Sequence, residues 1–543
     1  MEGDQSGVIW YPAALFTKAN DMTPNHLLVN LARRLLVLSA LLLVAGCATT
    51  RISYKRPAPE YALAPASTGI LHGHETAVRR QHGDKVSAFH LLDSNADGLE
   101  WRLALIDSAT SSLDLQYYLW YGDDGGLLLM HRTIAAANRG VKVRILIDDL
   151  DTILRDAATP ELRDHPFAVI DAHPNIEIRL FNPWNARMIL GRAFEMVEEM
   201  EHLNQRMHNK LLVADNRAAI IGGRNLGDEY LGLNSSFNFH DLDVFGIGPV
   251  ARDASAIFDR FWNSEWVMPV EALQEPLTDQ EVDDLRGQVA GQLQAAEALV
   301  GTPLETGDWH RDFTALAESM SIGASRTFTD TPDQDAVSHH MPDAIRDLLA
   351  TAKQELLITN AYIIPDEKFL ERLAELVRRG VKVRILTNSL ATHDVPAVNS
   401  HYKQWRESLL KAGIDLYEMR PDAAIRREIA DRAPVTSGFM GLHTKAIVVD
   451  RQRSFIGSMN LDPRSSEINS EMGVIIDSKE LAKKLAGVML RDMAPENSWH
   501  VVLSPKGGLR WLSEEEVLDI QPARDFLQRV EDQFFMMFPK DYY

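Results

Sequence analysis

The octapeptide Arg-Gly-Val-Lys-Val-Arg-Ile-Leu occurs twice, at Arg139–Leu146 and at Arg379–Leu386, an offset of 379 − 139 = 240 residues. An apolar run precedes each copy, beginning at Leu113 in the first case and at Leu356 in the second. Each unit therefore reads as helix, strand, helix, a glycine after the helix, and a β-branched strand. This is βαβ order, so the sequence predicts an α/β fold of two pseudo-repeated αβα domains with largely parallel, buried sheets.

A second pattern repeats with the same internal spacing, at an offset of 443 − 208 = 235 residues. Each copy holds His-x-Lys, then an aspartate, then a pair of small residues followed closely by an asparagine. The tripeptide His401-Tyr-Lys403 lacks these companions, and we interpret it as coincidental. The first copy comprises His208, Lys210, Asp215, Gly222, Gly223 and Asn225, and the second comprises His443, Lys445, Asp450, Gly457, Ser458 and Asn460.

These residue types fit a two-step exchange of phosphodiesters. One neutral imidazole attacks phosphorus to form a phosphohistidine, while the other protonates the leaving alkoxide and then serves as base. The side chains of Lys210, Lys445, Asn225 and Asn460 would bind the non-bridging oxygens, and the small pairs would let a phosphate approach the backbone. The two aspartates of the repeats follow strands at turns, so we interpret them as structural.

Each histidine also needs a carboxylate at its other ring nitrogen to fix the tautomer. Asp241 and Glu471 stand at equivalent places after the two motifs, and Asp243 is an alternative to Asp241. The scheme requires no metal or other cofactor. The stretch Asp93–Gly98 imitates a calcium loop but lacks the closing glutamate, so a polar turn is expected there.

The repeated motif resembles the phospholipase D superfamily. Longer stretches that begin at Gly222 and Gly457 are similar to the cardiolipin synthase C branch of the bacterial cardiolipin synthases, and the similarity runs from about Ser87 to the C-terminus. It implies a phospholipase D fold with one shared active site, and transfer of a phosphatidyl group from one phospholipid to the headgroup alcohol of another. By the same resemblance, His208 is the nucleophile.

The net charge and the single cysteine restrict the partners and the cellular location that we expect. With 56 basic and 77 acidic residues the formal net charge is −21, which counts against a nucleic-acid partner. Cys47 follows Arg33-Arg34, an apolar run too short to span a bilayer, and the tripeptide Val-Ala-Gly. This order is typical of a bacterial lipoprotein signal, so we expect lipidation of Cys47 and attachment to a membrane of the cell envelope, without a prediction of which membrane.

Composition and apolar patterning predict how the chain is divided into segments and domains. The terminal apolar stripe, which includes Phe526, Leu527 and Val530, is expected to pack onto the body, with membrane contact as the alternative. The apolar face within 188–201 is read as core, with a lipid-contacting lid as the alternative. We expect a signal peptide with lipobox over 1–47, a tether over 48–85, phospholipase D-like domains over 86–269 and 325–498, a polar helical connector without strands over 270–324, and a hairpin with a helix over 499–543.

The leading hypothesis is cardiolipin synthesis from two phospholipids, with phosphatidylglycerol as substrate and phosphatidylethanolamine as a second candidate. A hydrolytic phospholipase D would use the same residues with water as acceptor. A phosphodiesterase or nuclease of the superfamily, and a catalytically silent envelope lipoprotein, are weaker alternatives. The sequence leaves open any accessory protein and the choice between transferase and hydrolase.

Overall fold

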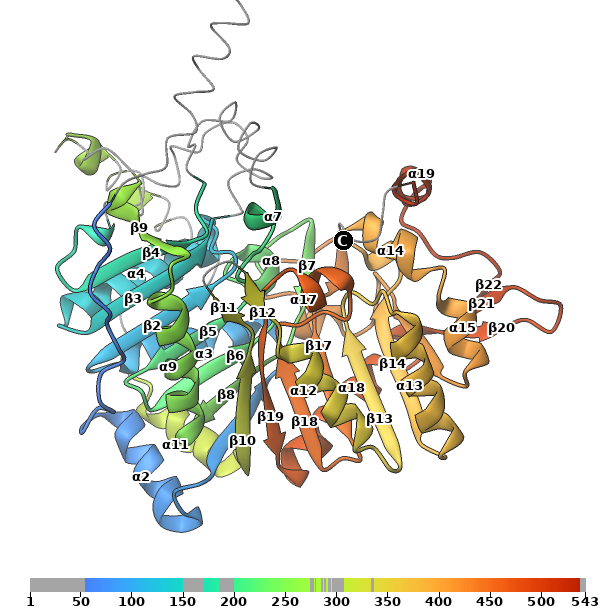
Figure 1. Ribbon diagram of the computed structural model, residues 1–543, viewed down its shortest axis with the longest axis horizontal. Helices are drawn as coiled ribbons and strands as arrows, with labels where there is room; N and C mark the ends of the chain where they lie inside the picture. The colour runs from blue at the N-terminus through green and yellow to red at the C-terminus, as the bar shows by residue number, and fades with distance from the viewer. Residues whose placement is uncertain are drawn as a thin grey trace, which may run out of the picture.

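The computed structural model describes residues 54–149, 170–184, 200–273, 307–333 and 336–537, with a few positions between 278 and 294. The signal segment with Cys47 and residues 188–199, whose apolar face was interpreted as core with a lid as the alternative, lie outside the described residues. The two halves of the chain lie side by side, the first blue to green and the second yellow to red in Figure 1. None of the described helices combines the length and apolarity needed to cross a bilayer.

The first half is built on a mixed sheet in the order β9-β4-β3-β2-β5-β6-β8-β1. Strands β2, β3 and β4 are parallel, as βαβ order requires, whereas the motif strand β5 runs antiparallel to β2 and to β6. The strands are β1 Ser87–Leu92, β2 Ser112–Tyr117, β3 Lys142–Asp148, β4 Ile176–Phe181, β5 Leu211–Ala214, β6 Ala218–Gly222, β8 Asp243–Ile247 and β9 Val267–Pro269.

The second half repeats this order as β10-β19-β18-β17-β13-β14-β15-β20, and β21 and β22 extend it. Antiparallel pairing of β1 with β10 joins the two sheets at the middle of the molecule. The strands are β10 Ser321–Thr329, β13 Glu355–Asn360, β14 Lys382–Asn388, β15 Asp415–Met419, β17 Lys445–Val449, β18 Arg453–Gly457, β19 Met472–Asp477, β20 Ser498–Leu503, β21 Leu509–Leu512 and β22 Val517–Leu518.

The expectation of largely parallel sheets was wrong, because each motif strand continues into a tight hairpin. Asp215 and Asn216 in the first half, and Asp450 and Arg451 in the second, adopt left-handed conformations with φ of 52–56°. Two consecutive residues of this kind form the hairpin turn that matches strand twist. The sequence repeat was visible, but the direction of these strands depends on turn geometry.

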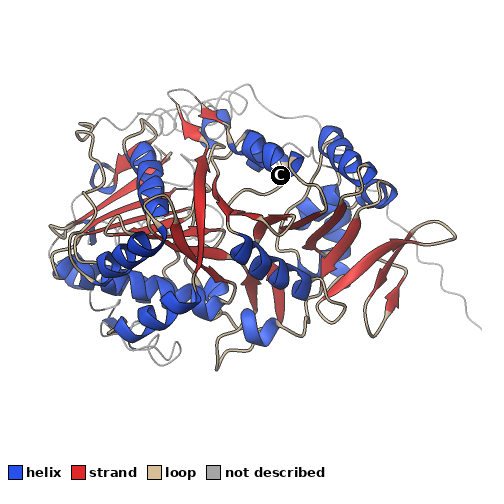
Figure 2. Cartoon of the chain, turned by 90° about the horizontal axis from the view of Figure 1, so that it is seen from below, coloured by secondary structure: helices blue, strands red, loops and turns tan. Residues whose placement is uncertain are grey.

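Helices cover both faces of the strands, as Figure 2 shows from below. One apolar core lies between the halves and receives α9 from the first and α18 from the second. Outer cores hold α3, α4 and α11 in the first half and α12, α13 and α15 in the second. The longer helices are α2 Ile70–His82, α3 Asn95–Ser108, α4 Asp124–Asn138, α9 Pro249–Trp262, α11 His310–Ser319, α12 Met341–Ala350, α13 Glu367–Arg378, α18 Lys479–Asp492 and α19 Phe526–Phe535.

Short strands and helices complete the fold. Strand β7 pairs in parallel with β16, and β11 pairs with β12. These strands are β7 Phe237–His240, β11 Thr331–Pro332, β12 Val337–Ser338 and β16 Phe439–Leu442, and the short helices are α7 Met200–Leu203, α8 Asp228–Leu231, η1 Val270–Ala272, η2 Leu390–Thr392, α14 Pro396–Tyr402, α15 Arg406–Lys411, α16 Arg426–Ile429 and α17 Pro463–Glu467.

Three sequence interpretations need correction. The segment Asp93–Gly98 is the start of α3, capped by Ser94, which accepts a hydrogen bond from the Asp97 amide. The described part of the expected tether is docked on the first half, where buried Glu75 of α2 pairs with Arg217. The expected strand-free connector contains the start of β10, which pairs with both β1 and β19.

A fourth correction concerns the C-terminal helix α19. Its apolar side chains were expected to pack onto the body, yet Phe526 is 79% exposed and Leu527 is 64% exposed. Gln528 and Asp532 are the buried side chains of this helix instead. The helix is therefore turned with its polar stripe inward.

Candidate active site

Two short parallel contacts between the halves bring the motifs together. Strand β16 ends one residue before His443 and pairs with β7, which ends one residue before Asp241. On the other side of the site, an isolated parallel bridge joins Met207 to Ser470, the residues before His208 and Glu471. Each motif histidine therefore lies beside a carboxyl-bearing residue that belongs to the opposite half.

The histidine–carboxyl pairs are crossed between the halves. His208 Nδ1 lies 2.9 Å from Glu471 Oε2, and His443 Nδ1 lies 2.5 Å from Asp241 Oδ2. Asp243 forms an ion pair with Arg102 instead of contacting a motif histidine. Of the two aspartates that the sequence left open, Asp241 is therefore the one that contacts a histidine. With Nδ1 engaged, the Nε2 atom of each ring remains for chemistry.

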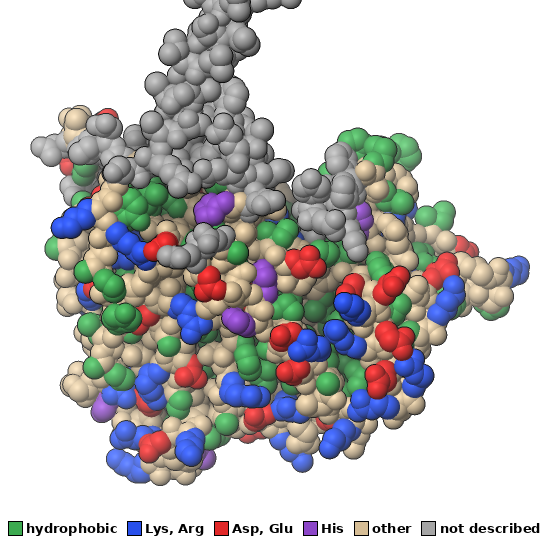
Figure 3. Space-filling model, in the orientation of Figure 1, with side chains coloured by type: hydrophobic (Ala, Val, Ile, Leu, Met, Phe, Trp, Pro, Cys, Tyr) green, Lys and Arg blue, Asp and Glu red, His purple; other side chains and the backbone are tan. Residues whose placement is uncertain are grey.

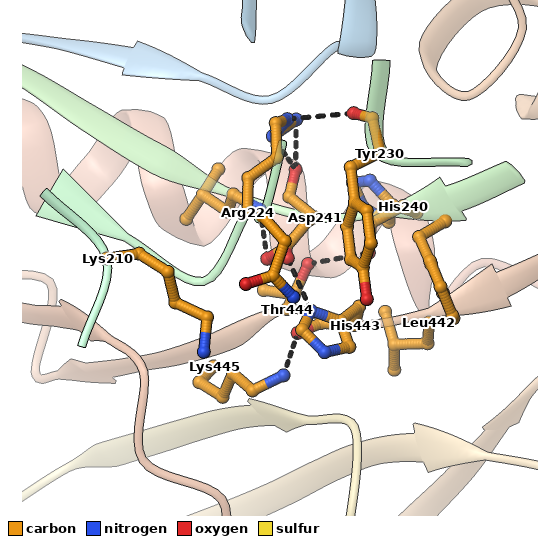
Figure 4. A network of polar contacts seen from close by, with 12 residues as sticks. Lys210, Arg224, Tyr230, His240, Asp241, Leu442, His443, Thr444 and Lys445 are labelled. Carbon is orange, nitrogen blue, oxygen red and sulfur yellow. Dashed lines mark hydrogen bonds and ion pairs between the residues drawn. The ribbon is translucent and has the colours of Figure 1, made fainter. Parts of the chain in front are cut away.

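The two motif lysines extend into the site, and Figure 4 shows both on the side of His443. Lys210 Nζ donates to the carbonyl of His208 at 2.7 Å, and Lys445 Nζ donates to that of His443 at 2.5 Å. Each ammonium also lies near a tyrosine ring, 4.9 Å from the centroid of Tyr118 for Lys210. His-x-Lys spacing thus places both functional groups of a motif within one small volume.

Burial and neighbouring charges shift the pKa values of the two histidines to different extents. Burial first, then the charges of Lys210 and Lys445, lower the pKa of His208 well below its usual range. Burial and Lys445 also lower the pKa of His443, but Asp241 opposes that shift. The mutual influence of residues from both motifs shows that they share one site. His208 is neutral near pH 7, while His443 is the ring that more readily holds a proton.

The pKa values of the Glu471 and Asp241 carboxyl groups are shifted in opposite directions. Burial raises the pKa of Glu471 well above its usual range. Burial acts in the same direction on Asp241, but His443 and Lys445 outweigh it, and the net effect lowers its pKa. The buried guanidinium of Arg224 adds to that lowering and donates to the Asp241 carbonyl at 2.9 Å. The surroundings thus shift the two carboxyl groups in opposite directions: the pKa of Asp241 is lowered, and that of Glu471 is raised although Lys210, Ser458 and Ser465 oppose the rise.

The small-residue pairs have a structural reason that the sequence interpretation missed. A Cβ atom on Gly222 would lie 2.2 Å from Asp243 Oδ1, and one on Gly223 would lie 2.6 Å from Asp241 Oδ1. In the second copy, the Ser458 hydroxyl donates to Glu471 Oε2 at 2.5 Å. The pairs thus make room for the carboxyl groups, or bond to them.

The motif asparagines lie close to the site. Asn225 Oδ1 accepts from the Leu119 amide at 3.3 Å, and its side chain also bonds to Tyr230, which lies 5.3 Å from the His443 ring centre. Asn460 is buried, and its Oδ1 has no hydrogen-bond partner within the described part of the chain.

The motif aspartates are structural, as predicted. The Asp215 carboxylate accepts from the amides of Thr110, Ser111 and Ser112, at the start of β2. Asp450 accepts in the same way from the amides that lead into β13. Each aspartate therefore ties a motif hairpin to the neighbouring strand.

Several residues of the site were not found from the sequence. The Ser465 hydroxyl donates to Glu471 Oε1 at 2.7 Å, and Asp330 accepts from the Glu471 amide at 2.9 Å. Tyr118 packs edge-on against the His208 ring, with centroids 4.9 Å apart. Tyr362 lies 6.4 Å from the His443 ring. Ser465 lies in a stretch that carried the resemblance, whereas Asp330 follows a strand that the sequence did not reveal.

The geometry fits in-line displacement at phosphorus. A neutral imidazole, a second imidazole held by an ionised carboxylate and two lysines surround one small buried volume. Among the described residues, no group of three or more His, Cys, Asp or Glu side chains is placed to hold a metal ion. The chemistry available from these side chains is nucleophilic attack with acid–base assistance.

Comparisons with known proteins agree with this geometry. A family model described as "Cardiolipin synthase, PLD-like domain" matches residues 103–262 and 345–493. Cardiolipin synthase C of Escherichia coli (strain K12) is 32% identical over 458 residues, which cover 83% of this chain and 94% of that protein. Major cardiolipin synthase ClsA of Bacillus subtilis (strain 168) is 27% identical over 74% of this chain and 68% of its own.

The fold is also that of a solved relative. The crystal structure of phosphatidylserine synthase from Haemophilus influenzae Rd KW20 superposes with a TM-score of 0.53, at 13% identity, over 85% of this chain and 97% of that one. The matched family model covers more than half of this chain and both motifs. The chain is therefore an enzyme of the phospholipase D superfamily and belongs to the family of cardiolipin synthases.

Proposed function

We propose that the protein is a phosphatidyltransferase that makes cardiolipin from two phospholipids through a phosphohistidine on His208. The observation that carries the proposal is the crossed pairing of His208 with Glu471 and of His443 with Asp241 in one buried site. The similarity of this chain to cardiolipin synthase C, which covers 83% of the chain, supports phospholipid substrates. Phosphatidylglycerol is the proposed donor and acceptor, and phosphatidylethanolamine is a second donor to test.

In the first step, His208 Nε2 attacks the phosphorus of the donor lipid and the bond to the headgroup oxygen breaks. His443 gives its proton to that oxygen, so the headgroup alcohol leaves and a phosphatidyl group stays on His208. The proton is held ready by ionised Asp241, which stabilises the imidazolium form of His443. Lys210 and Lys445 neutralise charge on the non-bridging oxygens.

In the second step, His443 takes the proton of the acceptor hydroxyl. The acceptor oxygen then bonds to phosphorus, the bond to His208 Nε2 breaks, and the new diester leaves. Water in place of the lipid alcohol would give phosphatidic acid. The two reactions differ only in which hydroxyl reaches the intermediate.

The experiment is incubation of the purified full chain with labelled phosphatidylglycerol and phosphatidylethanolamine in mixed micelles, with products identified by mass. Cardiolipin formation supports the proposal. Phosphatidic acid as the main product would replace it with a hydrolase, and the absence of any lipid product would contradict it. His443→Ala is the matched inactive control.

We also propose that Cys47 is lipidated and attaches the protein to a membrane of the cell envelope. The support is the order of basic residues, apolar run and Val-Ala-Gly before the cysteine. Globomycin treatment and Cys47→Ser should each leave a precursor of higher mass. Unchanged processing in both cases would remove this part of the proposal.

A further inference from the structure

The C-terminal helix α19 buries its polar stripe and exposes its apolar stripe. Asp532 is fully buried and accepts from Asn399 Nδ2 and from Lys403 Nζ, both at 2.6 Å. Gln528, one turn earlier, donates to the Leu390 carbonyl at 2.6 Å. A buried carboxylate with a cationic partner is costly to separate, so this orientation is fixed by specific bonds.

The tripeptide His401-Tyr402-Lys403, whose likeness to the motif we interpreted as coincidental, contributes to the contact that buries Asp532. Lys403 of His401-Tyr402-Lys403 follows α14 and provides the cation for Asp532. Gln521 also donates to Asp532 at 3.0 Å. The polar side of α19 is therefore satisfied by the body of the protein, and its other side faces out.

The outward side is a contiguous apolar surface, which we call the α19 face. Phe526, Leu527 and Val530 lie within one arc of the helix, Met537 follows its end, and Ile520 precedes it. Figure 3 shows apolar side chains gathered at the upper right, where Figure 1 places α19. Their exposed fractions are 79% for Phe526, 64% for Leu527, 46% for Val530, 72% for Met537 and 69% for Ile520.

The α19 face is connected to the active site through the loop around η2. Arg524, just before α19, donates to the Ala391 carbonyl at 2.7 Å. The next part of that loop holds His393, which stacks on the Tyr362 ring at 5.4 Å, and Tyr362 in turn faces His443. The helix is thus packed against the wall of the catalytic site.

We propose that the α19 face docks onto the surface of a phospholipid bilayer and brings the catalytic site to its lipid substrates. The choice of a bilayer as occupant rests on the proposed function, because a phosphatidyltransferase meets both substrates at a membrane. A helix with a wide apolar face lies in the headgroup region with that face toward the acyl chains. The exposed aromatic and aliphatic side chains of α19 fit this role.

The position of the proposed lipid anchor agrees with this docking. Cys47 lies 54 − 47 = 7 residues before Tyr54, whose hydroxyl donates to the Val267 carbonyl of β9. A chain of this length reaches at most about 25 Å. In Figure 1, β9 and α19 lie toward the same upper edge of the molecule, and α2 lies at the opposite edge. An anchor at Cys47 would hold that upper edge near the bilayer.

The test uses the fact that Cys47 is the one cysteine of the chain. In the full chain carrying Cys47→Ser, Leu527→Cys, Val530→Cys or Gln81→Cys is labelled with an environment-sensitive fluorophore. Gln81, on α2, is the control. With vesicles of phosphatidylglycerol and phosphatidylethanolamine, labels at the two α19 positions should shift to shorter wavelength and be quenched by acyl-chain-brominated lipids. The label at Gln81 should do neither.

Equal quenching at all three positions, or none at the α19 positions, would overturn the proposal. A shift that needs no vesicles and grows with protein concentration would also overturn it, since a second copy of the chain would then cover the face. Quenching at α19 in a protein that forms no lipid product would leave the docking surface intact and reject the proposed function instead.

A second measurement links the α19 face to turnover. Leu527→Glu and Val530→Glu place a charge on an exposed position, and Glu531→Gln on the same helix is the control. We expect about tenfold lower turnover of lipid in vesicles for the two glutamate variants. Turnover of short-chain phosphatidylglycerol below its micelle concentration should stay unchanged. Equal loss on both substrates would contradict docking as the cause.

Discussion

The two halves of the site share one motif but shift the pKa values of their carboxyl groups in opposite directions. After the small pair, the first half has Arg224 and the second has Met459 at the equivalent place. Arg224 is buried beside Asp241 and helps to keep it ionised, whereas Met459 offers no charge to Glu471. Arg224 thus adds to the lowering of the Asp241 pKa by His443 and Lys445, and the second copy has no charged side chain at the equivalent position.

The crossing of the pairs turns that difference into two roles. Ionised Asp241 serves the second-half histidine, His443, and makes it the better proton carrier. Burial raises the pKa of Glu471, so its carboxyl group supports an imidazolium form of His208 less strongly, and this ring stays available as a nucleophile. The symmetric duplication supplies both groups, and the asymmetric surroundings give them different chemistry.

The largest expected effect is the loss of either histidine. His208→Ala and His443→Ala should each lower turnover by at least about 10⁴-fold, because the nucleophile or the acid–base group is gone. Turnover of labelled phosphatidylglycerol is the measurement, with circular dichroism as the folding control. Mixing the two variants should restore nothing, because both motifs of a site lie in one chain. Restored activity would mean that sites form between chains.

The next effect separates the two carboxyl groups. Asp241→Asn removes a charge that supports protonated His443, and we expect about a 10³-fold loss of kcat. Glu471→Gln keeps the shape of a side chain whose raised pKa already disfavours its charged form, so we expect a loss of only about tenfold. Equal losses in the two variants would show that the carboxyl groups are not electrostatically different.

The pH dependence gives a smaller effect. Burial lowers the pKa of Lys445 to about 8, so this side chain is charged below that pH and neutral above it. Its attraction for the anionic diester should therefore weaken as the pH rises through about 8, and KM should rise. Lys445→Arg should remove that limb, because a guanidinium stays charged. A KM that is flat from pH 7 to 9 in the unaltered protein would contradict this account.

The smallest effect on catalysis is expected at the motif aspartates. Asp215→Ala loses bonds to several backbone amides and should lower the free energy of unfolding by about 2–4 kcal/mol. The kcat of the folded fraction should change little. Asp215→Asn is the matched control, since it keeps an acceptor and tolerates the left-handed backbone. Urea unfolding measures the change, and a large fall in kcat without loss of stability would make Asp215 catalytic.

Much of the site could be predicted because the motif is local and occurs twice. Spacing alone paired His with Lys and proposed Asp241 and Glu471 as the orienting carboxyl groups. The crossing could not be predicted, because it depends on pairing between segments more than 200 residues apart. Nor did the sequence reveal the electrostatic difference, which arises from the burial of both carboxyl groups and from the charges that surround each of them in the fold.

The fold was predicted in class but not in detail. βαβ order was correct for β2, β3 and β4, and tight turns made the motif strands antiparallel. Helical periodicity found the two faces of α19 but assigned them the wrong way round. Periodicity says which residues share a face, whereas the partners of Asp532, among them Lys403, lie far away along the chain.

The most direct test of the account is to identify the histidine that carries the covalent phosphatidyl group. Labelled phosphatidylglycerol would be reacted with the purified chain, quenched in alkali, in which phosphohistidine survives, and the peptides mapped by mass spectrometry. The account predicts the modification on His208, with none in His208→Ala. Modification of His443 would reverse the two roles, and a site that turns over lipid without modifying either histidine would contradict the mechanism.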